Sequence, residues 1–593
     1  MGDVPPSMSR IQLGTEGSYQ GVPFVVVGRI IYEWARGHWS EWHLRMSDGS
    51  STWLSDAQAE YAVTRQVENP GTLPAMGTYR PGMSVAVQGK RYAVSVITPA
   101  LYSGVEGELP FEYWDKLQIE FVDLRSPDGE FATIDFSEAP PSVYVGEYVD
   151  FADLRLTNLR DESFGAGPQA REVRGLNCPQ CGAPIELRTG ALAQTVACAT
   201  CTAILDARDQ NLSVVEQHQE KMKAAEPLIP LGASGTLDGA PWQVIGFQIR
   251  GVNVEGVVYR WREYLLWNAE RGFRYLTEYD GHWNDVVVLK NPPADGQPSA
   301  IRHDSRKFKH FQRAEATTFF VLGEFPWEVR SGDTAGADDY VAPPYMLSRE
   351  RTEQEVTWSL GTYTPPARIA EAFSLETKLP KPRGVFANQP NPRMGGARGL
   401  PRVFGGLTGV LILLAGARFM TARNEDVLTE RHRYSPTTGD TGAFVTEIFD
   451  LKGRTSNVRL KIDTDLSNAW AYLNLALLAD SGGTGYEFGR EISNYAGVDD
   501  GESWHEGSAN DKVIIPSVPP GRYYLRVEPE RGPEIRPYSY TLTVTRDVPR
   551  LWPFVVALFL LVAPWVLAAL RAVSFEYERW KESDHPWSSS DDD

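Results

Sequence analysis

The sequence contains little cysteine: four residues in 593, all between Cys178 and Cys201. It also lacks three common catalytic motifs. There is no Gly-x-x-x-x-Gly-Lys-Ser/Thr phosphate loop, no His-Glu-x-x-His helix and no Gly-x-Ser-x-Gly nucleophile elbow. These absences argue against P-loop nucleotidases, zinc proteases of that type and α/β-hydrolases.

Basic charge and helical periodicity are also scarce. The net charge is −19, from 77 acidic and 58 basic side chains, and no basic stripe with interleaved aromatic residues occurs, which argues against nucleic acid as a partner. The first residues contain no basic segment followed by an apolar run, so we expect no cleavable signal peptide. Length predicts three to five domains, and 17 tryptophans, 53 glycines and 41 prolines indicate many short strands and turns.

The four cysteines form two Cys-x-x-Cys pairs separated by sixteen residues. This spacing is typical of a four-thiolate zinc site, so we predict a zinc ribbon over residues 174–208 with structural Zn²⁺ on Cys178, Cys181, Cys198 and Cys201. Gly182 suits the first turn because glycine adopts left-handed dihedrals freely, whereas Thr202 holds the matching place in the second. Two disulfides or a redox pair are the alternatives; the first needs an oxidising compartment and the second a βαβ setting.

The chain contains an internal duplication. Residues 11–28 and 229–246 align without a gap and share eight of eighteen residues, and further matches continue downstream at an offset of 215 to 218. Alternating and aromatic segments in both copies predict two all-β modules, each a small barrel or curled sandwich, over 9–156 and 227–372.

Glu41 and Glu263 hold the same place in the two copies, beside Trp42 and Tyr264 respectively. We regard these four residues as candidate ligand contacts. The alternative for each glutamate is an acid that is hydrogen-bonded to turn amides or paired with an arginine inside the module.

These residues also carry a resemblance to a known family. The glycine-rich opening, the Trp-x-Glu-Trp/Tyr-x-Leu strand, the Gly-Glu-Leu/Phe-Pro motif and the interposed zinc ribbon resemble the bacterial family called domain of unknown function 4178, over residues 9–372. The resemblance implies a bacterial, often membrane-associated protein and no assigned activity. Members occur beside genes for aminopropyltransferase-like and membrane-stress proteins. The alternative function is therefore an accessory subunit or enzyme of a polyamine-related or envelope-stress modification system.

Two apolar runs follow the duplicated half. A polar connector helix is predicted over 212–225, and a basic Pro/Gly linker over 373–402. Residues 403–422 and 551–570 are predicted transmembrane helices, with Arg418 reaching the interface. The alternative for the first run is a buried glycine-rich helix.

Charge predicts the orientation of these helices. Six basic residues and no acidic one precede the first run between Lys378 and Arg402, so this side is expected to be cytosolic. The modules, the ribbon and an acidic tail over 571–593, with a disordered end, would then lie in the cytosol of a bacterium. Residues 424–548 would lie outside its inner membrane.

Residues 424–548 alternate in short segments and predict a β-sandwich. The acid-rich segment 499–506 is expected to be a loop with an exposed Trp504, which could stack on a sugar, while its acids could bind calcium.

The sequence therefore predicts a mainly β protein with two homologous barrel or sandwich modules, a zinc ribbon, two transmembrane helices and an extracytoplasmic sandwich. The expected function is that of a membrane-anchored, non-enzymatic binding or scaffold protein with a protein or peptide partner in the cytosol. A channel-like oligomer packed through Gly405, Gly406 and Gly409 is a further alternative. The sequence leaves the oligomeric state open.

Overall fold

The computed structural model describes residues 9–587, except 35–36, 58–59, 112–117, 161–175, 190–192, 209–211, 217–225, 294–298, 394–399, 436–441, 484 and 531–536. Contacts divide the chain into two compact units. One contains residues 1–392 and 572–593, and the other residues 393–571.

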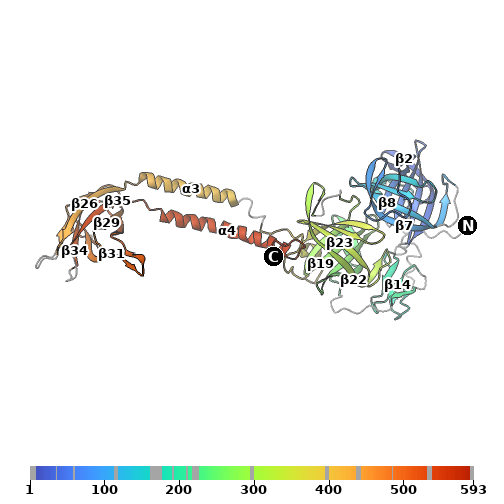
Figure 1. Cartoon of the computed structure of the whole chain (residues 1–593). Coiled ribbons are helices and arrows are strands. Elements are labelled where there is room, and N and C mark those ends of the chain that lie inside the picture. The colour runs from blue at the N-terminus through green and yellow to red at the C-terminus, as the bar shows by residue number, and fades with distance from the viewer. Residues whose placement is uncertain are drawn as a thin grey trace. The chain divides into compact units, whose positions relative to one another are not determined.

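The first copy of the duplicated module is a closed eight-stranded antiparallel barrel (Figure 1). Pairing of β2 with β7 closes the ring. Two short strands pair with them, β1 (Glu16–Tyr19) with β2 and β6 (Ser84–Val87) with β7. In ring order the strands are β2 (Val22–Trp34), β3 (Gly37–Met46), β4 (Ser51–Ala57), β5 (Glu60–Gln66), β10 (Ser142–Val149), β9 (Glu130–Asp135), β8 (Gln118–Arg125) and β7 (Lys90–Gly107).

The second copy repeats this barrel strand for strand. Pairing of β17 with β22 closes it, and β16 (Ser234–Leu237) and β21 (Ala300–His303) take the places of β1 and β6. In ring order the strands are β17 (Ala240–Val254), β18 (Val257–Asn268), β19 (Gly272–Tyr279), β20 (His282–Val288), β25 (Val356–Thr364), β24 (Tyr345–Arg351), β23 (Thr334–Ala342) and β22 (Arg306–Phe325).

The repeated glycines have a packing reason. Gly28 and Gly246 sit where the closing strands meet, and a Cβ at either position would overlap the backbone carbonyl of Glu108 or Glu324. Both also follow a bulge in the neighbouring pairing. Glycine is the residue that permits so close an approach of two backbones.

Each barrel has an apolar cluster on its outer face. In the first, Trp42 and Leu44 pack with Ile11 and with Leu154 of the 3₁₀ turn η1 (Phe151–Leu154). In the second, the corresponding cluster includes Ile369 of helix α2 (Pro366–Ala372). The segments that flank each copy therefore cover its outer wall.

The ribbon consists of β11 (Leu176–Asn177), β12 (Pro184–Ile185), β13 (Thr195–Ala197), β14 (Ile204–Asp206) and β15 (Val214–Glu216). Strand β13 pairs with the end of β22, so the ribbon extends the sheet of the second barrel. The predicted connector helix is wrong at 214–216, where β15 pairs with β14, and its remainder from 217 lies outside the described residues.

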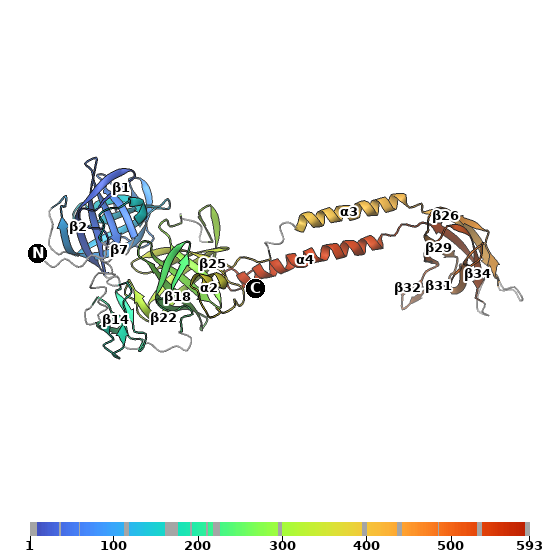
Figure 2. The same cartoon turned by 180° about the vertical axis from the view of Figure 1, so that it is seen from behind.

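The second unit contains a two-sheet β-sandwich and most of two long helices, α3 (Leu400–Thr421) and α4 (Trp552–Lys581) (Figure 2). One hydrophobic core joins the sheets. The first sheet is β26 (Glu425–Tyr434), β35 (Tyr538–Arg546), β29 (Ser456–Thr464) and β33 (Asn510–Val518). The second is β27 (Phe444–Val445), β34 (Gly521–Pro529), β30 (Ala469–Ala479), β31 (Gly485–Asp499) and β32 (Glu502–Gly507), with β28 (Phe449–Leu451) on β34.

The two helices are long and apolar enough to cross a membrane, and their apolar windows are fully exposed. A buried glycine-rich helix over 403–422 is therefore wrong. Arg418, the basic residue inside the first apolar run, donates from Nη2 to Asp547 Oδ1 over 2.8 Å.

The acid-rich segment 499–506 is a hairpin rather than the predicted loop. Strands β31 and β32 pair up to Asp499 and Glu502, with the turn at Asp500 and Gly501. Trp504 lies opposite Gly497 and remains 46% exposed. The missing side chain of Gly497 leaves room for the indole, since a Cβ there would lie 2.7 Å from it.

Helix α4 continues eleven residues past Leu570, and residues 572–587 belong to the unit of the barrels. Trp580 packs against Phe311 of β22, and the Arg313 amide donates to Asp584 Oδ2 over 2.7 Å. The acidic tail is thus packed on the second barrel up to His585, which lies 3.0 Å from His310, and Trp587 is exposed. Its predicted disordered end, 588–593, lies outside the described residues.

Candidate functional site

The four cysteines come together on two turns of the same build. In the first, the Cys178 amide donates to the Ala183 carbonyl and the Gly182 amide to the Cys178 carbonyl, both over 2.8 Å. In the second, the Cys198 amide donates to the Ala203 carbonyl and the Thr202 amide to the Cys198 carbonyl, both over 2.9 Å. Gly182 has φ +76° and Thr202 φ +62°, so a β-branched residue adopts the left-handed conformation that the second turn requires.

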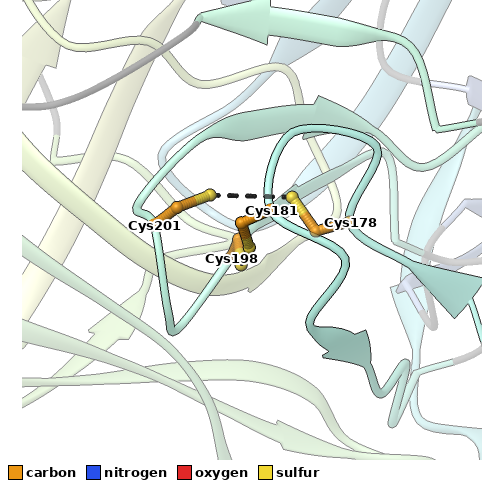
Figure 3. A group of neighbouring side chains, drawn as sticks. All are labelled: Cys178, Cys181, Cys198 and Cys201. Atoms are coloured by element: carbon orange, nitrogen blue, oxygen red, sulfur yellow. Dashed lines mark hydrogen bonds between the residues drawn. The ribbon is translucent and has the colours of Figure 1, made fainter.

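The sulfur positions fit a tetrahedral metal ion. All four Sγ atoms lie within 4.8 Å of one another, with Cys178–Cys201 at 3.6 Å and Cys181–Cys198 at 3.8 Å (Figure 3). Four sulfurs at about 2.3 Å from one tetrahedral ion would be about 3.8 Å apart. The cluster is therefore positioned to hold a metal.

The Cys201 thiol needs a metal to be charged, whereas hydrogen bonds within the cluster lower the pKa of Cys198 despite its burial. Burial, followed by hydrogen bonding with the other cysteines, raises the pKa of the Cys201 thiol to about 12. A coordinating cation removes this penalty, because a metal-bound thiol loses its proton outright. Among the residues that the structure describes, these cysteines are the one group of three or more His, Cys, Asp or Glu side chains arranged for a metal.

The ribbon is fixed to the second barrel by a buried carboxylate. Glu324, from the second Gly-Glu-Phe-Pro motif, is fully buried and accepts hydrogen bonds from the Arg188 amide (2.6 Å), the Thr189 amide (2.8 Å) and the Thr189 hydroxyl (2.7 Å). Burial raises the pKa of this carboxyl. In the first copy Glu108 keeps a side chain that is 76% exposed and lies 3.4 Å from Arg45.

One hollow, with a cavity volume of about 1970 Å³, is lined by inward-facing side chains of both barrels, by residues 383–387 of the linker and by Arg579 and residues 581–584 of the tail. An eight-stranded barrel is about the size that can hold one small ligand. Glu41 and Glu263 line this hollow, whereas Trp42 and Tyr264 are fully buried in the outer-wall clusters. The separation follows from strand geometry, since adjacent residues point to opposite faces. Trp504 lies apart from them, on the sandwich.

A tryptophan orients each glutamate in the same way. The Trp39 indole N–H donates to Glu41 Oε1 over 3.0 Å, and the Trp261 indole N–H to Glu263 Oε2 over 3.3 Å. Burial raises the pKa of Glu41 to about 8, against the hydrogen bonds with Ser55 and Trp39 that lower it. Glu41 is thus a carboxyl that stays protonated at neutral pH in the absence of a cation.

Two further acids of each barrel line the hollow, and the sequence did not identify them as candidates. Asp123 of the first barrel lies opposite Thr133, and Asp339 of the second lies opposite Ser348. Strand register makes these two positions equivalent. It places Asp135 opposite Phe121 and Glu350 opposite Ala337, again in one equivalent position. Three wall positions therefore carry a carboxyl in both barrels. Burial raises the pKa of Asp123 to about 6 and also raises that of Asp135. The 216-residue offset of Asp123 and Asp339 was the available signal.

A serine–histidine pair also occurs on the first barrel. His43 Nε2 lies 2.7 Å from Ser51 Oγ, and its Nδ1 lies 2.9 Å from the Glu108 carbonyl oxygen. The pair is exposed, and its third member is a backbone carbonyl rather than a carboxylate. The second copy has Leu265 and Phe273 in these places, so the pair is not part of the duplicated design.

Comparison with known families gives the same division of the chain. The model described as domain of unknown function (DUF4178) matches residues 12–151 and again residues 230–366. The two barrels are DUF4178 domains. The four-cysteine cluster lies between the DUF4178 copies, as the resemblance predicted. A search of curated proteins found no match.

Solved structures give only distant likenesses. The Cry4Aa toxin from Bacillus thuringiensis is 9% identical, with 52% of this chain and 53% of that one covered and a TM-score of 0.12. PNGF-II is 8% identical over 89% and 100% of the chains, at a TM-score of 0.14. A tandem CBM22 domain from Paenibacillus barcinonensis Xyn10C is 10% identical. The match covers 54% of this chain and 99% of that one, at a TM-score of 0.11. At these scores the likenesses carry no argument about the DUF4178 protein.

Proposed function

We propose that this protein is a membrane-anchored binding protein without a reaction of its own, with its DUF4178 barrels as binding modules. The observation that carries the anchoring is the position of the tail. The chain beyond the second apolar run packs on the second barrel through Trp580 and Asp584, although this barrel precedes the first helix. The barrels and the tail therefore share one side of any membrane, as two crossings by α3 and α4 require.

The basic linker supports a cytosolic position for the barrels and the tail. Its lysines and arginines precede α3 without an acid, which is the charge bias of a cytosolic segment. The sandwich then lies outside the inner membrane of a bacterium. The Arg418–Asp547 pair supports this arrangement, because it neutralises the basic residue of α3 beside the strand that leads into α4.

We assign the ion of the ribbon as structural Zn²⁺. Four thiolates at tetrahedral spacing suit zinc and leave no position for substrate, and a cytosolic ribbon keeps its thiols reduced. Metal analysis of protein purified without chelator is expected to give one zinc per chain. Double replacement of Cys178 and Cys181 by serine should abolish it, whereas stoichiometric iron would contradict zinc.

The binding role rests on two hollow barrels whose duplicated wall carboxyls are accompanied by no duplicated nucleophile–base pair among the described residues. A protein or peptide partner in the cytosol would use the outer surfaces of the same barrels. Cross-linking in membranes, followed by recovery of the full chain in detergent, tests this proposal. A stoichiometric cytosolic partner is expected, and recovery of the chain alone would contradict the scaffold role.

A further inference from the structure

The second DUF4178 barrel supplies a cation of its own, Arg250, to the lining of the hollow. Arg250 donates from Nη1 and Nη2 to the two carboxylate oxygens of Glu350, over 2.8 and 3.1 Å, and Nη1 lies 3.6 Å from Glu263 Oε2. The side chains of Arg250 and Glu263 are 11% and 10% exposed. Glu350 and Glu263, at two of the three duplicated carboxyl positions, thus share the guanidinium group of Arg250.

The first barrel has the same acids without this cation. Tyr32 stands in the place of Arg250, since each lies opposite the tryptophan of the neighbouring strand and follows the same bulge. Ile30 likewise stands in the place of Gln248, which donates to Glu263 Oε1 over 2.6 Å. Glu41 and Asp135 therefore lack the partners that their equivalents have in the second barrel.

Three basic groups of the lining, Arg125, Lys290 and His38, are engaged elsewhere, and His38 lies 3.8 Å from Glu33. Arg125 donates to the Leu289 carbonyl, lies 3.9 Å from Glu60 and stacks over Tyr148, and Lys290 lies 3.3 Å from Asp150. Arg125 acts on Asp123 at longer range, and burial outweighs its effect on the pKa of that acid. Over the described residues, no ion pair within 4.0 Å involves Glu41, Asp123 or Asp135.

Aromatic rings that pack on one another in a buried cluster line the hollow together with these acids. The Tyr32 ring stacks on Trp39 at 4.8 Å and lies 4.9 Å from Tyr102 and 5.0 Å from Phe121. All four side chains line the hollow. Aromatic faces attract cations, most strongly where water is excluded, so rings and carboxylates here favour the same kind of ligand.

We propose that the first DUF4178 barrel binds a small organic cation, with a guanidinium or alkylammonium head, between Glu41, Asp123 and Asp135. The head group of the cation pairs with these acids as the guanidinium group of Arg250 pairs with Glu263 and Glu350 in the second barrel, which is thereby closed to such ligands. This inference rests on the proposed binding function and names the ligand class of one of its two modules.

The test is a calorimetric titration of the full chain in detergent micelles with n-butylguanidinium, and with n-butylurea as a neutral probe of the same shape. It is run at about pH 8.5, above the pKa of Glu41. We expect one saturable site for the cation and at least about tenfold weaker binding of the urea, since a charged hydrogen-bonded pair contributes about 1.5–3 kcal/mol.

Three variants exchange the features of the two barrels. Tyr32→Arg supplies the first barrel with an internal guanidinium and should abolish binding, and Glu41→Gln should weaken it about tenfold. Arg250→Tyr removes the internal cation of the second barrel and should raise the stoichiometry towards two. Hydrogen–deuterium exchange of the β3 and β18 peptides verifies that each variant is folded.

Equal affinity for n-butylguanidinium and n-butylurea, or unchanged binding in folded Tyr32→Arg, would overturn the proposal. If Tyr32→Arg fails to fold, folded Glu41→Gln decides by the same criterion. Absence of cation binding together with an intact membrane position and a recovered partner would overturn this inference and leave the proposed function standing. Absence of cation binding, of the membrane position and of the partner would overturn both this inference and the proposed function.

Discussion

Glu324 and Glu108 hold the same position of a repeated motif, but only Glu324 is surrounded by donors. Replacing Glu324 with alanine leaves three buried donors, the Arg188 and Thr189 amides and the Thr189 hydroxyl, without an acceptor. At about 1–3 kcal/mol for each unsatisfied group, we expect the ribbon to be destabilised on the barrel by about 3 kcal/mol or more. The measurement is hydrogen–deuterium exchange of peptides from β13, with Glu108→Ala as the matched control. Equal exchange in the two variants would contradict the role of Glu324.

Glu41 makes the stability of the first barrel depend on pH. Its pKa is about 8 in the folded protein and about 4.5 when unfolded, so the folded state retains a proton that the unfolded state has lost. The stabilising effect is complete below about pH 4.5 and is lost as the pH rises through about 8, at up to about 1.4 kcal/mol per pH unit. The groups that face Glu41 are Trp39, Ser55, Asp123 and Asp135.

Replacing Glu41 with glutamine should remove this part of the pH dependence. The variant is expected to gain stability relative to the parent between pH 5 and about pH 8.5, because glutamine stays neutral. The readout is the exchange of β3 and β4 peptides in both proteins at matched pH, and Glu120→Gln, on the alternate positions of β8, is the control. A constant difference across this range would mean that Glu41 does not titrate as described.

At the residue scale the sequence predicted the ligand cluster of the ribbon but not the acid cluster of the barrels. Cysteine spacing within a few residues determines the two turns that bring the thiols together, so local sequence was enough. Glu41, Asp123 and Asp135 lie on strands far apart in the chain and meet only when the barrel closes. Thr202 also departs from the residue preference of its turn: it lies at positive φ while its amide donates to the Cys198 carbonyl.

At the scale of elements, helix α4 has one part predicted from hydropathy and another that only the fold reveals. The apolar run ends at Leu570, but the helix continues because its last turns pack on the second barrel. Arg579 lies there with a side chain that is 1% exposed. It donates to the carbonyls of Ala387 and Gln389 over 2.6 Å and of Phe386 over 3.2 Å. The hairpin β31–β32 was also not predicted, because the sequence does not show that the Trp504 indole packs over Gly497.

Arg579 should therefore hold the tail on the barrel. Replacing it with alanine removes the donor from three carbonyls and the cation over the Phe575 ring, for an expected loss of about 3 kcal/mol in docking of the tail. Limited proteolysis of the full chain in detergent should then cleave after residue 571 while the barrels stay intact. Glu578→Ala, one residue away and exposed, is the control and should leave the cleavage unchanged. Resistance of the Arg579 variant would show that other contacts suffice.

At the scale of the whole molecule, the packing of the tail on the second barrel connects the barrels with the two apolar helices. Charge bias predicted the orientation, and duplication predicted the two barrels, but neither indicated that the chain after the second helix returns to the barrels. Bonds from Arg313 to Asp584 and from Arg579 to the segment 386–389 provide that link. The link constrains the topology, because a tail bound to the second barrel is incompatible with a single crossing.

The topology can be tested with protease on intact spheroplasts that express the chain with one tag at each end. Cleavage is expected in the sandwich region, 424–548, and both tags should stay protected, because the barrels and the tail lie on the inner side. Inside-out vesicles should give the reverse pattern, and spheroplasts opened with detergent control for intrinsic resistance. Protection of one tag alone would mean that one helix fails to cross, and the tail could then not reach the barrel. Loss of both tags with an intact sandwich would place the barrels outside, where the ribbon thiols would be oxidised rather than available for zinc.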